Sequence, residues 1–537
     1  MSTKAFTNLN QVKKLFFIIT LALFTFTVLQ GQNHNGVSNS NHTSVTNNSH
    51  AAQDKTGAVT DNTDEFRDTL QSSQAMSQTA EGVATAEITE ALPVNPYKDI
   101  LAKKEISLNF WSIIRGILGM ASLVLIAWIF SLDRKRVNWR TVGFSLLMQF
   151  VIAVSVIAFP AVQSIFEFMG SLFVAVLDWT KAGSTFLFGS LMNVNSFGFI
   201  FVLQILPTII FFSALTSLFF YLGILQRVVW AMAWLLSKSL KLSGAESLST
   251  AGNIFLGQTE APLMVKEYIP KMTKSELMLI MTAGMSTMAG GVLAAYIGML
   301  GGGDRVMELE FAKHLLSASI MAAPGAIAIA KILKPQTEEI DNSVEVPKEK
   351  IGKNVLDAIS NGTTEGLKLA ANVGAMLLVF YALIAGFNAI FMKVGDLTSL
   401  NPVIADITNG RYDSLSLQFM LSYLFAPIIW LTGVSGNDLA LVGRLLGEKL
   451  IMTEFIGYQS LAEMIRTGAF ESSKSVIMAT YVLCGFANFA SIGILIGGVG
   501  GMAHNQKPVL SAFGFRSLLG ATLVALMSAA MVGMIIA

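Results

Sequence analysis

Apolar runs long enough to cross a lipid bilayer recur along this chain after residue 105. Only 13% of its 537 residues are charged, and 53% are hydrophobic. A soluble protein of this length would carry about a quarter charged residues. Backbone polar groups in lipid must be satisfied within the protein, and apolar runs of about 20 residues satisfy them as helices. The sequence therefore predicts an all-α polytopic membrane protein.

About eight runs have the length of a transmembrane helix. Two further stretches, 242–273 and 433–462, are too polar to span and too apolar for ordinary loops, so we expect re-entrant hairpins there. Residues 225–241 are basic and amphipathic, as in a helix along the membrane interface, and 414–432 is the expected counterpart. The expected spans are 110–131, 142–165, 197–222, 276–300, 311–333, 364–391, 473–497 and 511–536.

The beginning of the chain predicts export. Lys13 and Lys14 precede a short apolar run, which is typical of a signal peptide within 1–30; an uncleaved N-terminal hydrophobic segment is the alternative. The following residues, up to about 105, are mostly rich in Asn, Ser, Thr and Gln and have too little apolar surface to fold. The basic cluster at 134–136 places the end of the first span in the cytoplasm. We therefore expect 31–105 to be a disordered extracytoplasmic tail.

Each half of the chain places a glutamate among amides and hydroxyls inside apolar sequence. The first centre contains Gln258, Thr259 and Glu260, the second contains Glu454, and each precedes a glycine-broken hydrophobic helix. An ionisable group at membrane depth costs roughly 3 kcal/mol on lenient insertion scales, so such a residue usually has a functional role or an interaction partner. Interrupted segments in both halves indicate a transporter's binding site. The alternative is a structural glutamate that holds hairpin to helix.

The chemistry of these centres favours a neutral solute. Amides, hydroxyls and carboxylates gather there, including Asn488 and Ser491, but no lysine or arginine belongs to the centres, so an anionic ligand is disfavoured. Phe486 offers an apolar face for a ring. Asn253 could bind a hard cation through oxygen or could cap a half-helix, and the residues leave both interpretations open.

Two strings are similar to those of intramembrane aspartyl proteases. They are Gly301-Gly302-Gly303-Asp304 and Tyr412-Asp413. Both lie at polar loop edges and in the reverse chain order, so the two carboxylates would not share a buried site. We therefore expect that the protein is not an enzyme.

Residues 108–537 resemble the concentrative nucleoside transporter family, a group that includes bacterial sodium- or proton-coupled symporters. The resemblance rests on GNxFxGQTEAP at 252–262, STMAGGVLAAYI at 286–297, TEF at 453–455 and CGFANFASIGI at 484–494. It implies a homotrimer in which each protomer combines a scaffold with a mobile transport domain. The transport domain would contain the two hairpins and two partly unwound helices in inverted repeat.

The resemblance also implies roles for individual residues. Three residues would face the nucleobase and a fourth would pack against it: Gln258, Thr259, Glu260 and Val292. Three would hold the ribose hydroxyls with an aromatic ring alongside: Glu454, Asn488, Ser491 and Phe486. Sodium would bind Asn253 and the backbone carbonyls of Leu256, Thr287 and Met288. Gly257 leaves space beside the base, so we expect both purine and pyrimidine nucleosides to be accepted.

These observations predict a secondary active transporter that imports nucleosides across the bacterial inner membrane by symport with sodium. Proton coupling through Glu260 or Glu454 is the alternative, and a nucleoside-sensing receptor or a channel is a more distant one. The expected partners are a nucleoside, the lipid bilayer and further copies of the chain, with no nucleic acid polymer. After the tail, the expected segments are scaffold helices at 106–241, the first hairpin and transport helices at 242–333, a polar linker at 334–363, a scaffold helix and interfacial segment at 364–432, and the second hairpin and transport helices at 433–537.

Overall fold

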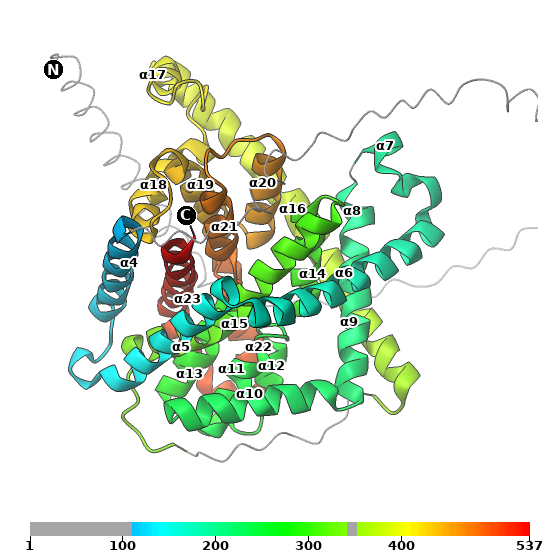
Figure 1. Cartoon of the computed structure of the whole chain (residues 1–537), viewed down its shortest axis with the longest axis vertical. Coiled ribbons are helices and arrows are strands. Elements are labelled where there is room, and N and C mark those ends of the chain that lie inside the picture. Colours follow the sequence, from blue (N-terminus) through cyan, green and yellow to red (C-terminus); the bar gives the residue numbers. More distant parts are fainter. Residues whose placement is uncertain (1–109, 199, 341–351, 537) are drawn as a thin grey trace, which may run out of the picture. The chain divides into compact units, whose positions relative to one another are not determined.

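Helices joined by turns make up the part of the chain that the computed structural model describes, which is residues 110–198, 200–340 and 352–536 (Figure 1). No strand occurs in these ranges, in agreement with the predicted all-α class. The expectations for 1–30 and 31–105 concern residues outside the described ranges.

Eight helical segments in the described ranges are long and apolar enough to cross a membrane. Most overlap the predicted spans, with two differences. The segment Pro160–Met192 also qualifies, although Glu167, Asp178 and Lys181 interrupt its apolar sequence. The predicted span at 473–497 is instead two shorter helices, α21 (Ser473–Leu483) and α22 (Phe489–Met502).

Three of the eight segments form the buried centre of the protein. In α13–α14 (Lys274–Ser286 and Gly290–Gly301), α15 (Arg305–Leu333) and α23 (Lys507–Ile535), 89% to 94% of the most apolar stretch is buried. The corresponding share is 11% to 33% in the outer segments. These outer segments are α4 (Phe110–Ile129), α5 (Trp139–Ala158), α6 (Pro160–Phe188) with η2 (Gly189–Met192), α8 (Phe201–Gln204) with α9 (Leu206–Tyr221), and α16 (Val355–Leu397).

Two helix–turn–helix segments lie where the sequence predicts hairpins. The first consists of α11 (Gly244–Gly252) and α12 (Glu260–Leu263), and the second of α19 (Leu439–Ile451) and α20 (Glu454–Arg466). A capping box fixes the start of α11, because Ser243 accepts from the backbone of Glu246 while the Glu246 side chain accepts from Ser243. Both glutamates of the polar centres stand at the first position of the second helix. Their depth in a membrane stays a prediction.

The helix after each hairpin is broken, and the two breaks meet. One break separates α13 from α14, and the other separates α21 from α22. Gly485 in the second break has a φ of 88°, and a Cβ atom there would lie 2.4 Å from the carbonyl oxygen of Ser286 at the end of α13. Only glycine satisfies both the left-handed backbone and the close approach. Both halves thus share one order of elements: hairpin, broken helix and a closing helix of 29 residues.

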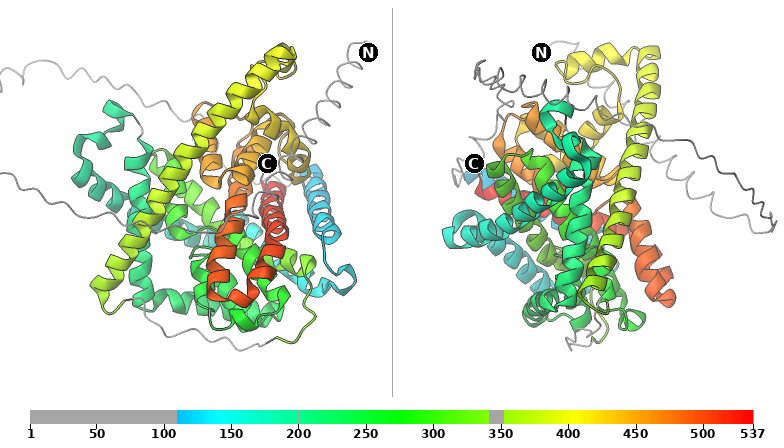
Figure 2. Two further views of the ribbon diagram at one scale, coloured as in Figure 1. Left: turned by 180° about the vertical axis from the view of Figure 1, so that it is seen from behind. Right: turned by 90° about the vertical axis from the view of Figure 1, so that its right-hand side faces the viewer.

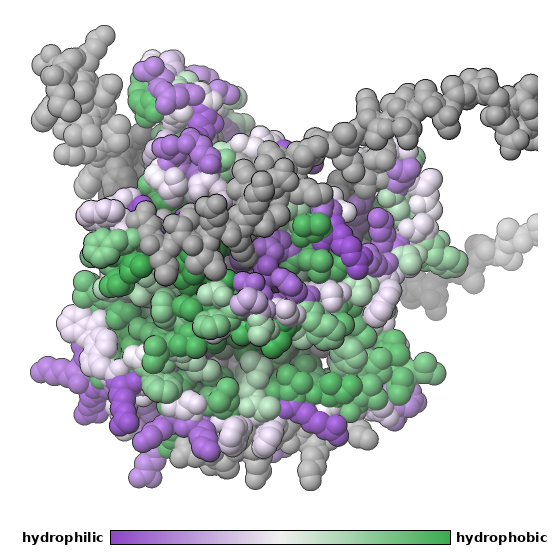
Figure 3. Space-filling model, viewed as in Figure 1, coloured by the Kyte–Doolittle hydropathy of each residue, from purple (hydrophilic) through white to green (hydrophobic). Residues whose placement is uncertain are grey.

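The outer helix α16 is 43 residues long and passes in front of the other helices in the left view of Figure 2. It begins at Val355, before the expected start at 364, and packs against α9. Gly362 permits this contact, since a Cβ there would lie 2.6 Å from Cβ of Ser217. Hydrophobic residues cover much of the face shown in Figure 3, as expected for a membrane protein.

The predicted interfacial helix is α10 (Ile224–Leu240), and its expected counterpart coincides with α18 (Leu417–Thr432). Asp304 of the protease-like string caps α15, because its side chain accepts from the backbone of Val306 and Met307. The remaining short elements are η1 (Arg134–Arg136), α7 (Val194–Phe197), η3 (Ile269–Lys271), α17 (Leu400–Ile407), η4 (Gly436–Asp438) and η5 (His504–Gln506).

Candidate functional site

The structure brings polar residues of both halves together at the start of α22. Gln258, in the turn of the first hairpin, donates from Nε2 to Oγ of Ser491 at 3.2 Å. Asn488 caps α22, since its Oδ1 accepts from the backbone N–H of Ser491 at 2.8 Å. All three residues are buried. The first hairpin and the second broken helix therefore share one hydrogen-bonded centre.

Glu454 extends this centre into the second hairpin. Its Oε2 accepts from Nδ2 of Asn488 at 2.9 Å, and its Oε1 accepts from the hydroxyl of Tyr296 at 3.0 Å. The side chain is buried. A chain of hydrogen bonds thus runs from Gln258 through α22 to the second hairpin and on to α14.

Tyr296 and Tyr458 are site residues that the polar pattern of the sequence does not predict. Their rings stack with centroids 4.1 Å apart, and the Tyr458 hydroxyl donates to the carbonyl of Thr480 at 3.0 Å. Tyr296 stands one helical turn after the predicted ligand Val292, so both side chains lie on the same face of α14. This spacing from Val292 is the sequence feature that could have indicated Tyr296 as a site residue. The stack fixes the hydroxyl that contacts Glu454.

The other predicted substrate ligands lie around this chain of bonds. Thr259 lies against α22, where a Cβ on Gly498 would come within 2.6 Å of its methyl group. Val292 is buried on α14. Phe486 lies in the second break, partly buried and packed against the core. Within the second break, the carbonyl of Phe486 accepts from the backbone N–H of Asn488 at 2.9 Å, and the place of the Phe486 ring beside a substrate stays a prediction.

Glu260 is held differently from Glu454. Its Oε2 accepts from the backbone N–H of Gly257 at 2.9 Å, and its side chain is exposed in the single chain. Among the described residues, Glu260 forms no ion pair. A Cβ on Gly257 would touch this carboxylate at 3.4 Å. The Glu260 carboxylate therefore folds back onto the turn that carries it, and its other side remains accessible.

Asn253 is the strongest indication of a cation site. It is fully buried, and neither its amide oxygen nor its amide nitrogen has a hydrogen-bond partner in the described part of the chain. Asn253 is the C-cap residue of α11 through its backbone N–H, which donates to the carbonyl of Ser249 at 3.0 Å, but its side chain makes no cap bond to a described residue. Buried polar groups are normally paired, and an amide oxygen is a suitable ligand for a hard cation.

The other predicted sodium ligands lie in the two segments that meet next to Asn253. The backbone N–H of Gly290 donates to the carbonyl of Phe255 at 3.0 Å, which joins the hairpin turn to the break before α14. Leu256, Thr287 and Met288 are buried in these two segments. The geometry is compatible with a site built from one amide and backbone carbonyls, although their role as ligands stays a prediction.

A buried lysine lies beside the second break, although the sequence predicts no basic residue in the polar centres themselves. Lys449 is fully buried near the end of α19. Its Nζ donates to the carbonyls of Val482 at 3.0 Å and Cys484 at 2.6 Å. The folding of the hairpin over α21 brings the ammonium to the second break, which chain position alone does not reveal. Both bonds go to carbonyls, so this ammonium is already engaged.

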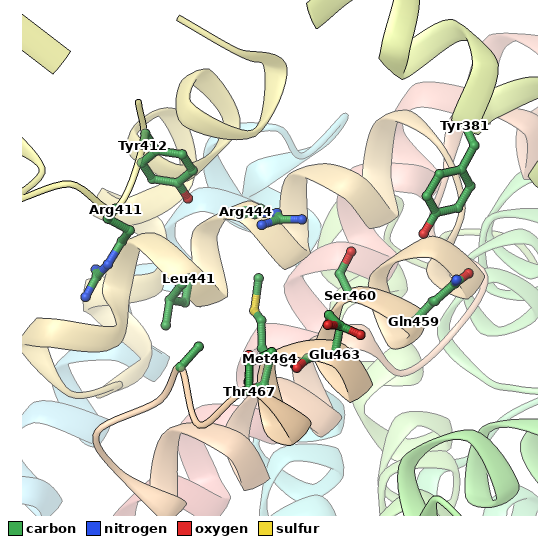
Figure 4. A pocket seen from close by; sticks show the side chains of 11 residues that line it. Tyr381, Arg411, Tyr412, Leu441, Arg444, Gln459, Ser460, Glu463, Met464 and Thr467 are labelled. Carbon is green, nitrogen blue, oxygen red and sulfur yellow. Dashed lines mark hydrogen bonds between the residues drawn. The ribbon is translucent and has the colours of Figure 1, made fainter. Parts of the chain in front are cut away.

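A pocket of about 410 Å³ lies between α16, the turn before α18 and the second hairpin (Figure 4). None of the predicted ligands lines it. Its arginines are occupied: Nε of Arg444 contacts Oε1 of Glu448 at 2.7 Å, and Arg411 donates to the carbonyl of Asn437 at 3.1 Å. The pocket is therefore separate from the predicted binding site.

Known proteins are similar to this chain over most of its length. Family models match in three places: "Na+ dependent nucleoside transporter C-terminus" at 314–533, "Na+ dependent nucleoside transporter N-terminus" at 118–191, and "Nucleoside recognition" at 202–303. An uncharacterized transporter of Haemophilus influenzae is 39% identical over 437 residues, which cover 79% of this chain and 98% of the relative. Sodium/nucleoside cotransporter 1 of Mus musculus is 36% identical, and the match covers 78% of this chain but 63% of that longer protein.

A solved structure shows the same fold. CNTnw in an inward-facing substrate-bound state superposes with a TM-score of 0.72 at 35% identity, covering 79% of this chain and 98% of CNTnw. The helical fold and these matches define a multi-span membrane transporter rather than an enzyme. The chain belongs to the Na+ dependent, or concentrative, nucleoside transporter family, which confirms the resemblance found in the sequence.

Proposed function

We propose that this protein is a secondary active transporter that imports nucleosides across the cytoplasmic membrane by symport with sodium. One observation carries the proposal: the hydrogen-bonded centre of Gln258, Ser491, Asn488 and Glu454 lies in the same broken helices and hairpins as the buried Asn253. The side-chain amide of Asn253 has no hydrogen-bond partner among the described residues. The relatives named as sodium/nucleoside cotransporters support the same assignment.

The donors and acceptors of the centre suit a nucleoside. Carboxylates and amides accept from and donate to hydroxyls and ring heteroatoms. Gln258, Thr259 and Glu260 face the base, with Val292 packed against it. A second group of residues holds the ribose hydroxyls, with an aromatic ring alongside: Glu454, Asn488 and Ser491, and the ring of Phe486. The Lys449 ammonium is engaged by the carbonyls of Val482 and Cys484 and is not free to bind a phosphate, so we expect neutral purine and pyrimidine nucleosides.

Sodium and nucleoside bind with positive linkage. Sodium would take the Asn253 amide and the carbonyls of Leu256, Thr287 and Met288. A cation there orders the hairpin turn that carries Gln258, so that each ligand raises the affinity for the other by the same factor. The two hairpins with their broken helices then move as a rigid body against the outer helices α9 and α16, carrying both ligands across.

A homotrimer in the bacterial inner membrane, with the N-terminal tail outside the cytoplasm, completes the proposal. The supporting observation is α16, whose most apolar stretch is only 11% buried within one chain. Such a helix is covered by lipid or by another copy. Native mass spectrometry of the detergent-solubilised protein tests the assembly: three copies are expected, and a monomer would contradict it.

Uptake of labelled uridine into proteoliposomes tests the function. We expect accumulation under an inward sodium gradient and little uptake without one. Uptake driven by a proton gradient and indifferent to sodium would replace sodium with protons, with Glu260 or Glu454 as the titrating group. Counterflow exchange from preloaded vesicles separates a carrier from a channel or receptor, because only a carrier exchanges labelled for unlabelled substrate. Absence of uptake in all conditions would refute nucleoside transport.

A further inference from the structure

Helix α10 lies on the side of the protein that carries the basic cluster of 134–136. It packs against α11, where the carboxylate of Glu246 binds Nζ of Lys331 at 2.7 Å. Lys331 is in the last turn of α15, and the carbonyl of Leu333, the last residue of α15, accepts from the backbone N–H of Leu132 at 2.9 Å, close to the cluster. The excess of lysine and arginine predicts that this side is cytoplasmic. We therefore expect α10 beside the cytoplasmic leaflet, where anionic lipids lie.

The exposed side of α10 carries a basic stripe. Its members, Arg227, Trp234 and Lys238, are all exposed. Successive residues of a helix are rotated by about 100°, so these three positions fall within about 40° of one another. The helix contains no aspartate or glutamate. The residues that pack into the protein lie on the opposite side of the helix: Val229, Ala233, Leu236 and Leu240.

The protein does not neutralise the two basic side chains of the stripe. Within the described ranges, neither Arg227 nor Lys238 forms an ion pair. Nζ of Lys238 lies 4.8 Å from the ring centroid of Trp234, a cation–π contact that leaves the ammonium without a carboxylate partner. Indole rings are enriched at the headgroup level of membranes. The stripe thus combines two uncompensated positive charges with an aromatic ring.

Large apolar side chains lie on both sides of the basic stripe. Trp230 is 46% exposed on one side, and Val228 and Leu235 are 42% and 48% exposed on the other. A soluble anion could neutralise the stripe, but it would leave these apolar surfaces in water. The boundary between headgroups and acyl chains covers both, because phosphates bind the basic side chains while acyl chains contact the apolar ones. The combination therefore favours a lipid surface over a soluble polyanion.

We propose that the exposed side of α10 is a docking surface for anionic phospholipids, whose headgroup phosphates bind Arg227 and Lys238. The helix is bounded by two left-handed residues, Gly223 with a φ of 73° and Lys241 with a φ of 54°. It joins the outer helix α9 to the first hairpin, so bound lipid holds this connection at the membrane surface. Lipid binding at α10 does not depend on the proposed function, because it concerns the surrounding bilayer and not the transported solute.

Quenching of tryptophan fluorescence by brominated lipids tests this surface, because bromine quenches only nearby rings. The full chain is reconstituted in phosphatidylcholine vesicles that contain the same small share of brominated phosphatidylglycerol, which is anionic, or of brominated phosphatidylcholine. The chain has 7 tryptophans, so the signal of a Trp230→Phe/Trp234→Phe variant is subtracted to isolate α10. We expect the anionic lipid to quench α10 at least about twofold more than the neutral lipid. High salt should reduce this preference.

A pair of charge substitutions locates the preference on the stripe. Arg227→Gln with Lys238→Gln removes both charges from exposed positions, and we expect the two lipids then to quench α10 equally. The matched control is Lys181→Gln with Lys393→Gln, which removes the same charge from exposed positions on α6 and α16 and should keep the preference. Uptake of uridine is not needed for either measurement, so failure of the proposed function is distinguished from failure of lipid docking.

Three results would overturn lipid docking at α10. Equal quenching of the wild-type protein by both lipids would exclude a preference for anionic headgroups. A preference that survives in the Arg227→Gln/Lys238→Gln variant, or that disappears equally in the control, would exclude the stripe as its origin. Quenching by neither lipid would show that another surface, such as a second copy of this chain, covers the helix. If the charge variant does not fold, the wild-type comparison and its salt dependence still decide the question.

Discussion

Glu454→Gln is the substitution that most directly tests the shared polar centre. The carboxylate accepts from Tyr296 and Asn488 at 3.0 and 2.9 Å. Glutamine has the same shape, but only its oxygen accepts, while its NH₂ group donates. It can keep both neighbours only by accepting from Asn488 and donating to the Tyr296 hydroxyl, so both charge-assisted bonds become neutral ones.

The expected cost follows from this exchange. A hydrogen bond to a charged group contributes about 1.5–3 kcal/mol, and a neutral one about 0.5–1.5 kcal/mol. Two such replacements destabilise the hydrogen-bonded site by roughly 2 kcal/mol, which corresponds to about a 30-fold change in the equilibrium constant for forming these bonds. The ribose hydroxyls also lose a charged acceptor. We therefore expect nucleoside affinity to fall by at least about tenfold.

Equilibrium binding of labelled uridine to the purified protein in detergent measures this loss without requiring transport. Glu463→Gln is the matched control, because Glu463 lies on the same helix, α20, but its side chain is 53% exposed and pairs with Arg466. Exposed ion pairs contribute about 0–1 kcal/mol, so its affinity should stay near wild type. A Glu454→Gln variant that binds uridine as tightly as the Glu463→Gln variant would refute the assignment of Glu454 to the site.

Three further predictions concern the fold and the tail. Gly485→Ala should prevent folding, because the new Cβ would lie 2.4 Å from a backbone oxygen and the backbone φ is 88°. Gly493→Ala should be neutral, because no atom lies within 4 Å of the position of its Cβ. Size-exclusion chromatography of the solubilised protein distinguishes the two variants. Lys331→Met should lower the free energy of unfolding by about 3–5 kcal/mol, because it leaves the fully buried Glu246 carboxylate, 2.7 Å from the lysine Nζ, without its ion-pair partner. In a thermal-unfolding assay, adding Glu246→Gln should restore part of this stability. No recovery of stability would contradict the pairing. Deletion of 31–95 should impair uridine uptake less than Glu454→Gln, and the reverse order would contradict the division into site and tail.

Much of the fold was accessible from the sequence because lipid restricts backbone structure so strongly. Long apolar runs must be helices there, and most predicted spans coincide with observed ones. Of the two differences, the additional span at Pro160–Met192 has a physical reason. Asp178 and Glu167 on this helix reach Arg305 at 3.1 Å and Lys313 at 3.8 Å, and such pairings cannot be seen in a hydropathy pattern. The charged residues interrupt the apolar sequence of this segment, so the sequence did not predict it as a span.

The candidate site was predictable by residue type but not by pairing. Gln258, Glu454, Asn488 and Ser491 stood out as polar residues in apolar sequence, and the structure joins them by hydrogen bonds. The spacing of Tyr296 from Val292 indicates only that the two side chains share a helix face, and it does not identify Glu454, 158 residues away, as the partner of Tyr296. Residue type alone indicates the chemistry, whereas the partner depends on which helices pack together.

The sequence by itself determined that the chain is an α-helical membrane protein, that two acidic polar centres interrupt it, and that glycines break the helix after each centre. Those features depend on local composition and on the energetic cost of polar groups in lipid. Only the tertiary structure decided that Gly485 meets Ser286 where the two breaks cross, and that the Lys449 ammonium caps one of them. Contacts between distant segments arise from the packing of whole helices, and no local pattern records them.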